Sequence, residues 1–547
     1  MERQDVPPVS AVFLVVFDQK VGYTIAWKRN LPEIDLDGVE YKSLPSGLHA
    51  VKEDLIYFIH GAHAGVSVFV QDAADAKHRN ANFAAVGALV PLSYGQLGRS
   101  WIHAAELRRL ARDVVKNTSD TRALELFWKE HRADQAFRRS SLSPAATRDA
   151  PNAGLESRKR KRALSDATLA DFNAEGTWPP DHPALHVPAI LDMFGPLLFP
   201  LHRAVLSRKR VLLLGSPSVQ DNANTVYIAS VLSSIPRGLG ESLPPESEPL
   251  FRSVPLFSVG IHDIPSLSSR DDSTGWVACT TDDILGEKKY LYDLLVQLPA
   301  SQPAATKIWP KLKTSDGKIL KASQRDLRRW TLLRRELRRL RRQMVGTYSD
   351  DSASAEIDES DERPLLRRNK SSSELYDNTG LQERDEAEAT EPSTWTSLAY
   401  KGFMWWASAG EASAWENDET KADEELLFDM PDVGGLFPEA ATSGKTDAER
   451  EMEYSRAAAT MLVAYFRRVT EVVLRTMSAI VEEADDETEE GIQEDEIQIN
   501  GEDVRAMGLD SWSEADKGFV ADMVKVWFDR DAVVTDQGVR VCGMRIC

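Results

Sequence analysis

The sequence predicts an α/β protein in which an α+β module precedes an α/β module and a helical C-terminal region, with long disordered insertions between them. Short β-branched and aromatic runs separated by turn residues fill the first part of the chain. Such runs then alternate with helical patterns, and acidic, serine-rich stretches interrupt the second half. These changes of pattern delimit five segments: residues 1–135, 136–178, 179–345, 346–445 and 446–547.

Residues 1–135 are predicted to form a small antiparallel sheet with flanking helices. The expected strands are short apolar runs, the first two joined as a hairpin: residues 10–17, 23–27, 55–60, 66–70 and 83–91. Residues 100–115 then carry apolar side chains at near-helical spacing. The following segment, 136–178, is dominated by Ser, Ala, Pro and Arg, so we expect a disordered basic linker.

Residues 179–345 are predicted to form a largely parallel sheet covered by helices, because strand-like and helical stretches alternate along them. The expected strands are residues 210–214, 256–260 and 276–280. The expected helices are residues 183–207, with breaks at prolines, 222–235 and 290–298.

An arginine-rich helix ends this segment. In residues 325–342 and just beyond, apolar side chains recur at steps of three and four residues: Trp330, Leu333, Leu337, Leu340 and Met344. The residues that we single out on this helix are Arg328, Arg329, Trp330, Arg334, Arg335 and Arg338. Three interpretations are open: the helix docks on the protein's own core with its arginines outward, it clamps an acidic partner or an acidic tract of this chain, or it lies on anionic lipid.

The second half of the chain is acidic. Residues 346–445 contain the runs 350–362 and 383–391 and are expected to be largely disordered. An aromatic stretch at 395–406 is expected to pack back onto the globular part, with partner binding as the second interpretation and interfacial membrane insertion as the third. In the last segment, residues 448–481 and 513–528 are expected to be helices.

Composition limits the classes of partner. The net charge is −20, which disfavours general affinity for nucleic acid and for anionic membranes. The basic tract 158–162 suggests a nuclear-localisation or phosphate-binding patch, or a solvated charge run that keeps the linker extended. Three scattered cysteines form neither a disulfide framework nor a zinc site, which predicts a cytoplasmic protein. The first residues lack the pattern of a signal peptide, and no apolar run reaches the ~18 residues of a membrane span.

Sequence motifs for nucleotide binding, metal binding and covalent catalysis are weak or absent. The strand, loop and helix around residues 211–218 lack the glycines of nucleotide-binding loops, so an ordinary turn is expected there. His60 and His63 have no third ligand at a characteristic spacing, so we expect no metal. Neither a nucleophile elbow nor a cysteine–histidine pair is evident, and we expect no covalent catalysis and no cofactor.

Several stretches of the sequence resemble one known family. Residues 12–23 (VFLVVFDQKVGY), 44–49 (LPSGLH) and 54–58 (DLIYF) resemble the N-terminal longin-like module of DENN proteins. Residues 210–216 (RVLLLGS), 255–262 (PLFSVGIH) and 275–282 (GWVACTTD) resemble strands of the central DENN module. The chain is most similar to the LCHN-like branch of the family and its fungal relatives. The five segments then correspond to a longin-like module, a linker, a central DENN module, an acidic insertion and a helical C-terminal DENN region.

The resemblance implies guanine-nucleotide exchange on a Rab-type small GTPase in membrane trafficking. The alternative is a DENN-like scaffold or adaptor that binds a GTPase or traffic proteins without exchange. By position in the family, the expected GTPase contacts are Ile261, His262, Asp263 and Leu267. The implied location is cytoplasmic, with peripheral contact to endomembranes. A nuclear role would rest on the basic tract and the arginine-rich helix alone, against a net charge of −20.

Overall fold

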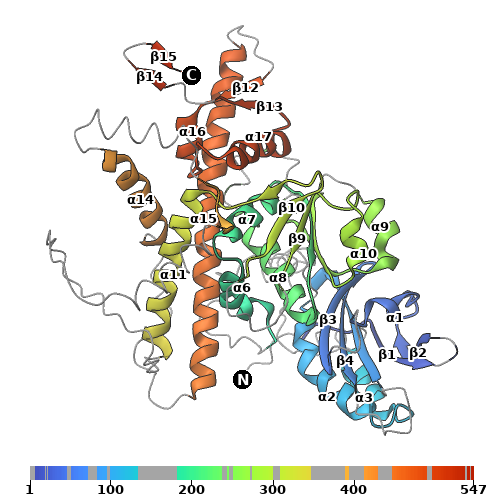
Figure 1. Ribbon diagram of the computed structural model, residues 1–547. Coiled ribbons are helices and arrows are strands. Elements are labelled where there is room, and N and C mark those ends of the chain that lie inside the picture. The colour runs from blue at the N-terminus through green and yellow to red at the C-terminus, as the bar shows by residue number, and fades with distance from the viewer. Residues whose placement is uncertain are drawn as a thin grey trace, which may run out of the picture.

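The computed structural model describes residues 6–18, 20, 22–45, 51–71, 83–94, 99–132, 181–236, 239, 243–244, 251–270, 274–299, 308–345, 388–392, 412–428, 446–489, 496–535, 539–541 and 544–546. The predictions of a linker at 136–178, of a basic tract at 158–162 and of an aromatic segment at 395–406 fall outside these residues. A mixed sheet of eleven strands organises the molecule, in the order β11-β10-β9-β6-β8-β7-β3-β4-β5-β1-β2 (Figure 1).

The N-terminal half of the sheet is antiparallel, as predicted. Its strands are β1 (Ala11–Asp18), β2 (Gly22–Asn30), β3 (Glu53–His60), β4 (His63–Gln71) and β5 (Phe83–Pro91). Both faces are covered, since alternate residues of β1 enter two different hydrophobic clusters. The covering helices and 3-10 turns are α1 (Val39–Lys42), η1 (Leu92–Tyr94), η2 (Ser100–His103), α2 (Ala104–Val114) and α3 (Arg122–His131).

The central half of the sheet is largely parallel, also as predicted. Four parallel strands, β6 (Arg210–Leu214), β7 (Val254–Ser258), β8 (Trp276–Thr280) and β9 (Leu294–Gln297), are extended by antiparallel β10 (Lys311–Thr314) and β11 (Ile319–Leu320). The helices of this half include α8 (Val219–Leu232), η8 (Ile261–Asp263), α9 (Ile264–Ser268) and α10 (Asp283–Glu287).

The prediction of a helix at residues 290–298 is wrong, because strand β9 lies there. Its apolar residues are buried between β6 and β10. A four-residue apolar run that is buried on both faces has no period that separates strand from helix. The Asp293 carboxylate fixes the start of the strand by accepting a hydrogen bond from the Arg210 backbone N–H, at 2.8 Å.

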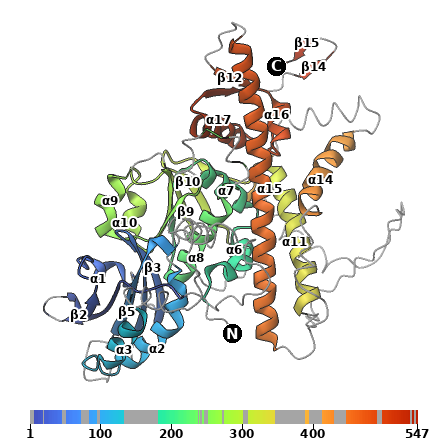
Figure 2. The ribbon, with the colours of Figure 1, turned by 180° about the vertical axis from the view of Figure 1, so that it is seen from behind.

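The helical segment predicted at 183–207 is broken as expected. It consists of η4 (Pro183–His186), α6 (Val187–Phe194), η5 (Gly195–Leu197) and α7 (Leu198–Leu206). By length and apolarity Pro183–Leu206 is the one segment of the described chain that could span a membrane, yet 67% of its most apolar window is buried inside the protein. Its apolar side chains pack in the main core with those of α8 and α15, which accounts for their composition (Figures 1 and 2).

The C-terminal part is built on long helices. They are α11 (Gln324–Val345), α14 (Ala412–Phe428), α15 (Asp447–Glu489), α16 (Gly501–Ala506) and α17 (Glu514–Phe528). Helix α15 runs between α6 on one side and α11 on the other (Figures 1 and 2). This region also contains strands that the sequence did not predict: β12 (Glu496–Ile499), β13 (Asp531–Val534), β14 (Val539–Val541) and β15 (Met544–Ile546). Buried Arg203 of α7 joins the helices, because it pairs with Asp326 of α11 and Asp516 of α17.

Candidate functional site

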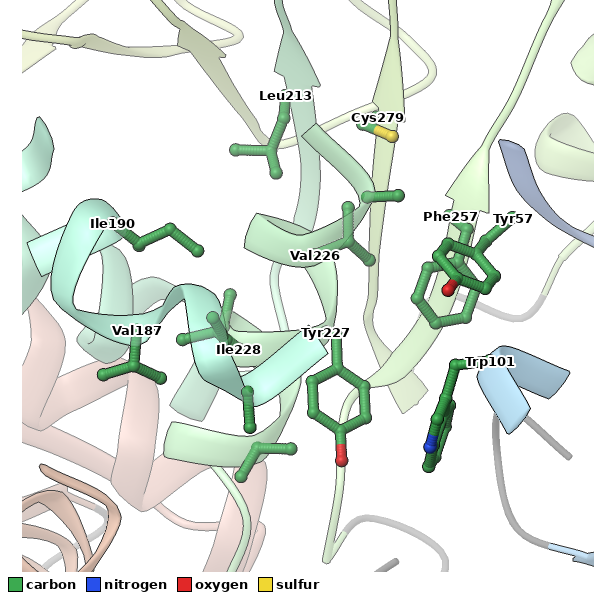
Figure 3. Close-up of a cluster of buried hydrophobic side chains, with 14 of the residues drawn as sticks. Tyr57, Trp101, Val187, Ile190, Leu213, Val226, Tyr227, Ile228, Phe257 and Cys279 are labelled. Carbon is green, nitrogen blue, oxygen red and sulfur yellow. The ribbon is translucent and has the colours of Figure 1, made fainter. Parts of the chain in front are cut away.

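The two halves of the sheet meet at a narrow seam. In the part of the chain that the structure describes, β3 and β7 share one backbone pair, between Phe58 and Phe257. Phe257 has a left-handed backbone, with φ 58°, and β7 has a bulge between Pro255 and Phe257. Aromatic packing fills the interior of the seam: the rings of Tyr57 and Phe257 lie 6.1 Å apart (Figure 3). The junction therefore depends on side chains more than on an extended ladder.

Asp263 joins the two halves near the surface of this seam. Its carboxylate accepts a hydrogen bond from the Gly260 N–H at 3.0 Å, which fixes the loop after β7. The same carboxylate lies 2.6 Å from Nζ of Lys42, which belongs to α1 of the N-terminal half. Lys42 also donates to the Ile59 carbonyl on β3, at 3.1 Å. Asp263 is only 6% exposed, so its role is to hold the loop in place.

Three exposed side chains neighbour this ion pair in the sequence, and we call Tyr41, Ile261 and His262 the seam patch. Tyr41 comes from α1, and the other two come from the loop after β7. The rings of Tyr41 and His262 are stacked, with centroids 4.0 Å apart and planes at 20°. Tyr41 is 46% and Ile261 47% exposed, so both side chains are accessible to a partner. The patch exists only where the two modules meet.

The four predicted contact residues separate into two groups. Ile261 and His262 are exposed and lie in the seam patch. Asp263 is held in the ion pair beneath them, and Leu267 is buried in the cluster that α9 forms with the central sheet. The side chain of Leu267 is therefore unavailable for a contact in this conformation. The sequence did not single out Tyr41 or Lys42, because no local pattern links α1 to a loop more than two hundred residues later.

A cavity of about 340 Å³ adjoins the seam. Its walls come from both halves, and they consist of Ile59, Gly61, Leu92, Val254, Pro255, Leu256 and Arg270. Burial lowers the pKa of the Arg270 guanidinium, the one charged group in this lining. The cavity is largely apolar, and so it suits an apolar side chain better than a phosphate.

A buried carboxylate fixes the inner side of the junction. Asp54 of β3 accepts hydrogen bonds from the N–H groups of Val219 and Gln220, at 2.8 and 3.2 Å, and from the Ser218 hydroxyl at 3.1 Å. It thereby caps helix α8 of the central half. Burial raises the pKa of Asp54, while these hydrogen bonds act in the opposite direction. An acidic side chain at a helix N-terminus is also favoured by the helix dipole.

The cap on α8 concerns the nucleotide-binding loop that the sequence analysis considered at residues 211–218. The strand β6, the loop 215–218 and α8 have the arrangement of a phosphate-binding turn, but the first N–H groups of α8 are bonded to Asp54. At the other candidate motif, His60 Nε2 lies 2.9 Å from the Asp35 carbonyl. Within the described residues no group of three potential metal ligands occurs.

The arginine-rich helix α11 combines two of its three interpretations. Trp330, Leu333 and Leu337 on its apolar face are buried, and α11 packs along α15. Leu340 and Met344 are partly buried against the same core. The helix thus docks on the protein's own core. Its first half is at the same time clamped by an acidic tract of this chain.

That tract is helix α14, which the sequence did not predict inside the acidic insertion. Asp423 pairs with Arg325 at 3.1 Å and with Arg329 at 2.8 Å, and all three side chains are buried. Glu419 pairs with Arg328, and Glu424 lies 3.6 Å from Arg335. Farther along, Arg334 lies over the Trp330 ring, and Arg338 is exposed. The run of acidic residues was the available signal for α14. Its pairing with the arginines of α11 joins residues 98 positions apart, such as Arg325 and Asp423, so the local pattern did not reveal it.

Comparison with known proteins gives two family matches. The family described as DENN domain-containing protein 11 matches residues 12–308. A family described as a domain of unknown function matches residues 390–496 and 487–547. The first match covers the strands of the large sheet from β1 to β9 but ends before β10 and β11. The second match covers α14 and the helices that follow it.

Individual relatives match different shares of the chain. The chain is 30% identical to DENN domain-containing protein 11 of Xenopus laevis over 290 residues, which are 53% of this chain and 59% of the relative. Identity to the Danio rerio protein of the same name is 32% over 292 residues, 53% of each chain. These alignments thus span little more than half the length of the vertebrate relatives. The uncharacterized protein ANR2 of Saccharomyces cerevisiae is 24% identical over 567 residues, 97% of this chain and 93% of the relative.

Proposed function

Since the chain belongs to the family of DENN domain-containing protein 11, we propose that it is a guanine-nucleotide exchange factor for a Rab-type small GTPase in membrane trafficking. The observation that supports a binding surface most directly is the seam patch of Tyr41, Ile261 and His262. This patch combines aromatic and aliphatic side chains from two modules with a fixed geometry. Rigid apolar anchors of this kind carry much of the affinity at protein interfaces.

Exchange requires no nucleophile, base or metal from the exchange factor. The factor binds the nucleotide-free GTPase more tightly than the loaded form, and this difference in affinity lowers the barrier to nucleotide release. A surface preorganised on two modules suits that task, because little freedom is lost on binding. Asp263 and Lys42 are positioning residues in this proposal, since their ion pair holds the loop that carries Ile261 and His262.

The test is release of a fluorescent guanine nucleotide from a panel of Rab GTPases, with and without the full chain. We expect acceleration for one or a few members. Ile261→Ala should slow that release by about tenfold, because loss of one central apolar anchor costs on the order of 1–2 kcal/mol. Ile319→Ala is the matched control: Ile319 is 59% exposed, but it lies on β11 at the far end of the sheet. Equal effects of the two variants would contradict the proposed site.

A second function, a scaffold that binds a GTPase or traffic proteins without exchange, rests on the same patch. The two functions differ in one measurement. A scaffold binds a Rab protein that is nucleotide-free or loaded with GTP but leaves the rate of nucleotide release unchanged. In both cases we expect the chain to act in the cytoplasm, with peripheral contact to endomembranes through its partner, and to bind no nucleic acid.

A further inference from the structure

The second half of α11 carries a row of arginines on one face. Arg334, Arg338 and Arg342 are spaced four residues apart, so they lie along one face of the helix, and we call them the arginine stripe. In the part of the chain that the structure describes, none of the three forms an ion pair with a carboxylate. Arg334 contacts the Trp330 ring, 6.0 Å from its centroid, and Arg338 and Arg342 are exposed.

The stripe is a positive surface on which like charges lie close together. Burial and the neighbouring Arg334 and Arg342 lower the pKa of Arg338, although Asp192 acts in the opposite direction. Like charges four residues apart on a helix destabilise it. The first half of the same helix is different, because Asp423 and Glu419 of α14 neutralise Arg325, Arg328 and Arg329. An anionic segment bound to the stripe would extend that arrangement along the helix.

We propose that residues 350–362 of this chain dock on the arginine stripe. The segment begins five residues after the end of α11 at Val345. Its acidic residues outnumber the arginines of the stripe: Asp350, Asp351, Glu356, Asp358, Glu359, Asp361 and Glu362. Carboxylates paired with guanidinium groups form the strongest hydrogen bonds available to either. The inference goes beyond the proposed function and does not depend on it.

The chain is long enough for this contact. From Arg334 to Arg342 the stripe extends over eight helical steps, about 12 Å. The five steps from Val345 to Asp350 reach about 17 Å when extended, so the acidic segment can fold back past Arg342. Covalent attachment gives such a segment an effective concentration in the millimolar range, which favours it over acidic partners in solution. The net charge of −20 disfavours an anionic membrane as the occupant, because most of the chain would be repelled.

Carbodiimide coupling tests the contact directly, since it joins a lysine amine to a carboxylate only when the two are in contact. In the full chain, Arg334, Arg338 and Arg342 are each replaced by lysine, which keeps the charge. Arg341→Lys is the internal control, because Arg341 lies 3.3 Å from Glu451 of α15. We expect links from positions 334, 338 and 342 to residues 350–362, identified by mass spectrometry and lost in high salt. Control links to Glu451 with none to residues 350–362, or stripe links only to other carboxylates, would overturn the proposal.

Vesicle binding separates the segment from a membrane as the occupant. A chain with the seven carboxylates replaced by Asn or Gln should bind phosphatidylserine vesicles more tightly than the unchanged chain, because the stripe is then free. Arg338→Gln should weaken the binding of the neutralised chain alone. If Arg338→Gln instead weakens the unchanged chain equally, the stripe faces a membrane and the proposal fails.

Discussion

Asp54 shows at the scale of one residue how the two modules are joined. It lies on β3, but its carboxylate holds the N-terminus of α8 through the backbone of Val219 and Gln220. Asp54→Ala leaves these buried N–H groups without an acceptor, so we expect a loss of about 2 kcal/mol or more in the free energy of unfolding. Urea denaturation measures this loss. Asp37→Ala, at an exposed position, should change stability little, and equal effects of both variants would rule out the capping role.

Three buried histidines predict how stability depends on pH. Burial lowers the pKa of His103 to about 4 and those of His182 and His202 to about 3. At pH values below 6.5, the ordinary pKa of histidine, these three histidines therefore bind protons in the unfolded chain. In the folded chain they stay neutral until the pH approaches their lowered pKa values. Stability is fully present above pH 6.5 and falls on acidification, with each histidine contributing up to about 1.4 kcal/mol per pH unit until its folded pKa is reached.

One variant isolates this effect. His202 Nε2 lies 3.2 Å from the Thr470 hydroxyl of α15, so His202→Asn should lower stability at pH 7.5 as well. The informative quantity is the slope between pH 6.5 and 5, which should be shallower in the variant because one titrating group is gone. Urea denaturation at several pH values gives that slope. An unchanged slope would assign the acid sensitivity to other groups.

At the scale of elements, α11 and α14 depend on one carboxylate. Asp423 faces both Arg325 and Arg329, and its pKa is lowered, because these arginines outweigh the effect of burial. Asp423→Asn leaves two buried guanidinium groups without a counter-charge, which should cost about 3–5 kcal/mol. Thermal unfolding measures the loss, and hydrogen exchange should show α14 released first. Glu424→Gln, one residue away and more exposed, should cost less than about 0.5 kcal/mol.

At the scale of the whole molecule, the two halves of the sheet behave as one body only if their seam contacts are energetically coupled. A double-mutant cycle of Lys42→Met and Asp263→Asn measures that coupling, since the two groups lie on different modules. We expect an interaction free energy of about 1 kcal/mol from urea denaturation. Strict additivity would show that the ion pair contributes nothing to the junction. Neither residue lies in the seam patch itself.

The sequence by itself determined the strands from β1 to β8 and the long helices α11, α15 and α17. Short apolar runs separated by turn residues predicted the strands from β1 to β5. The three- and four-residue spacing of apolar side chains predicted α11 with its buried apolar face. Ser513 predicted the start of α17, where its hydroxyl accepts from the Asp516 N–H. These features are local, because the residues that create each pattern are neighbours along the chain. The family resemblance followed from the same local patterns, and the match over residues 12–308 confirms it.

Only the tertiary structure decided which distant residues share a surface. It stacked Tyr41 on His262, placed Asp54 on α8 and folded the acidic helix α14 against the arginines of α11. It also made residues 294–297 a strand, because β6 and β10 flank them. Such pairings join side chains far apart in sequence, and their energies come from burial and from charges brought together by the fold. A pattern read along the chain carries no information about these partners until the fold has brought them together.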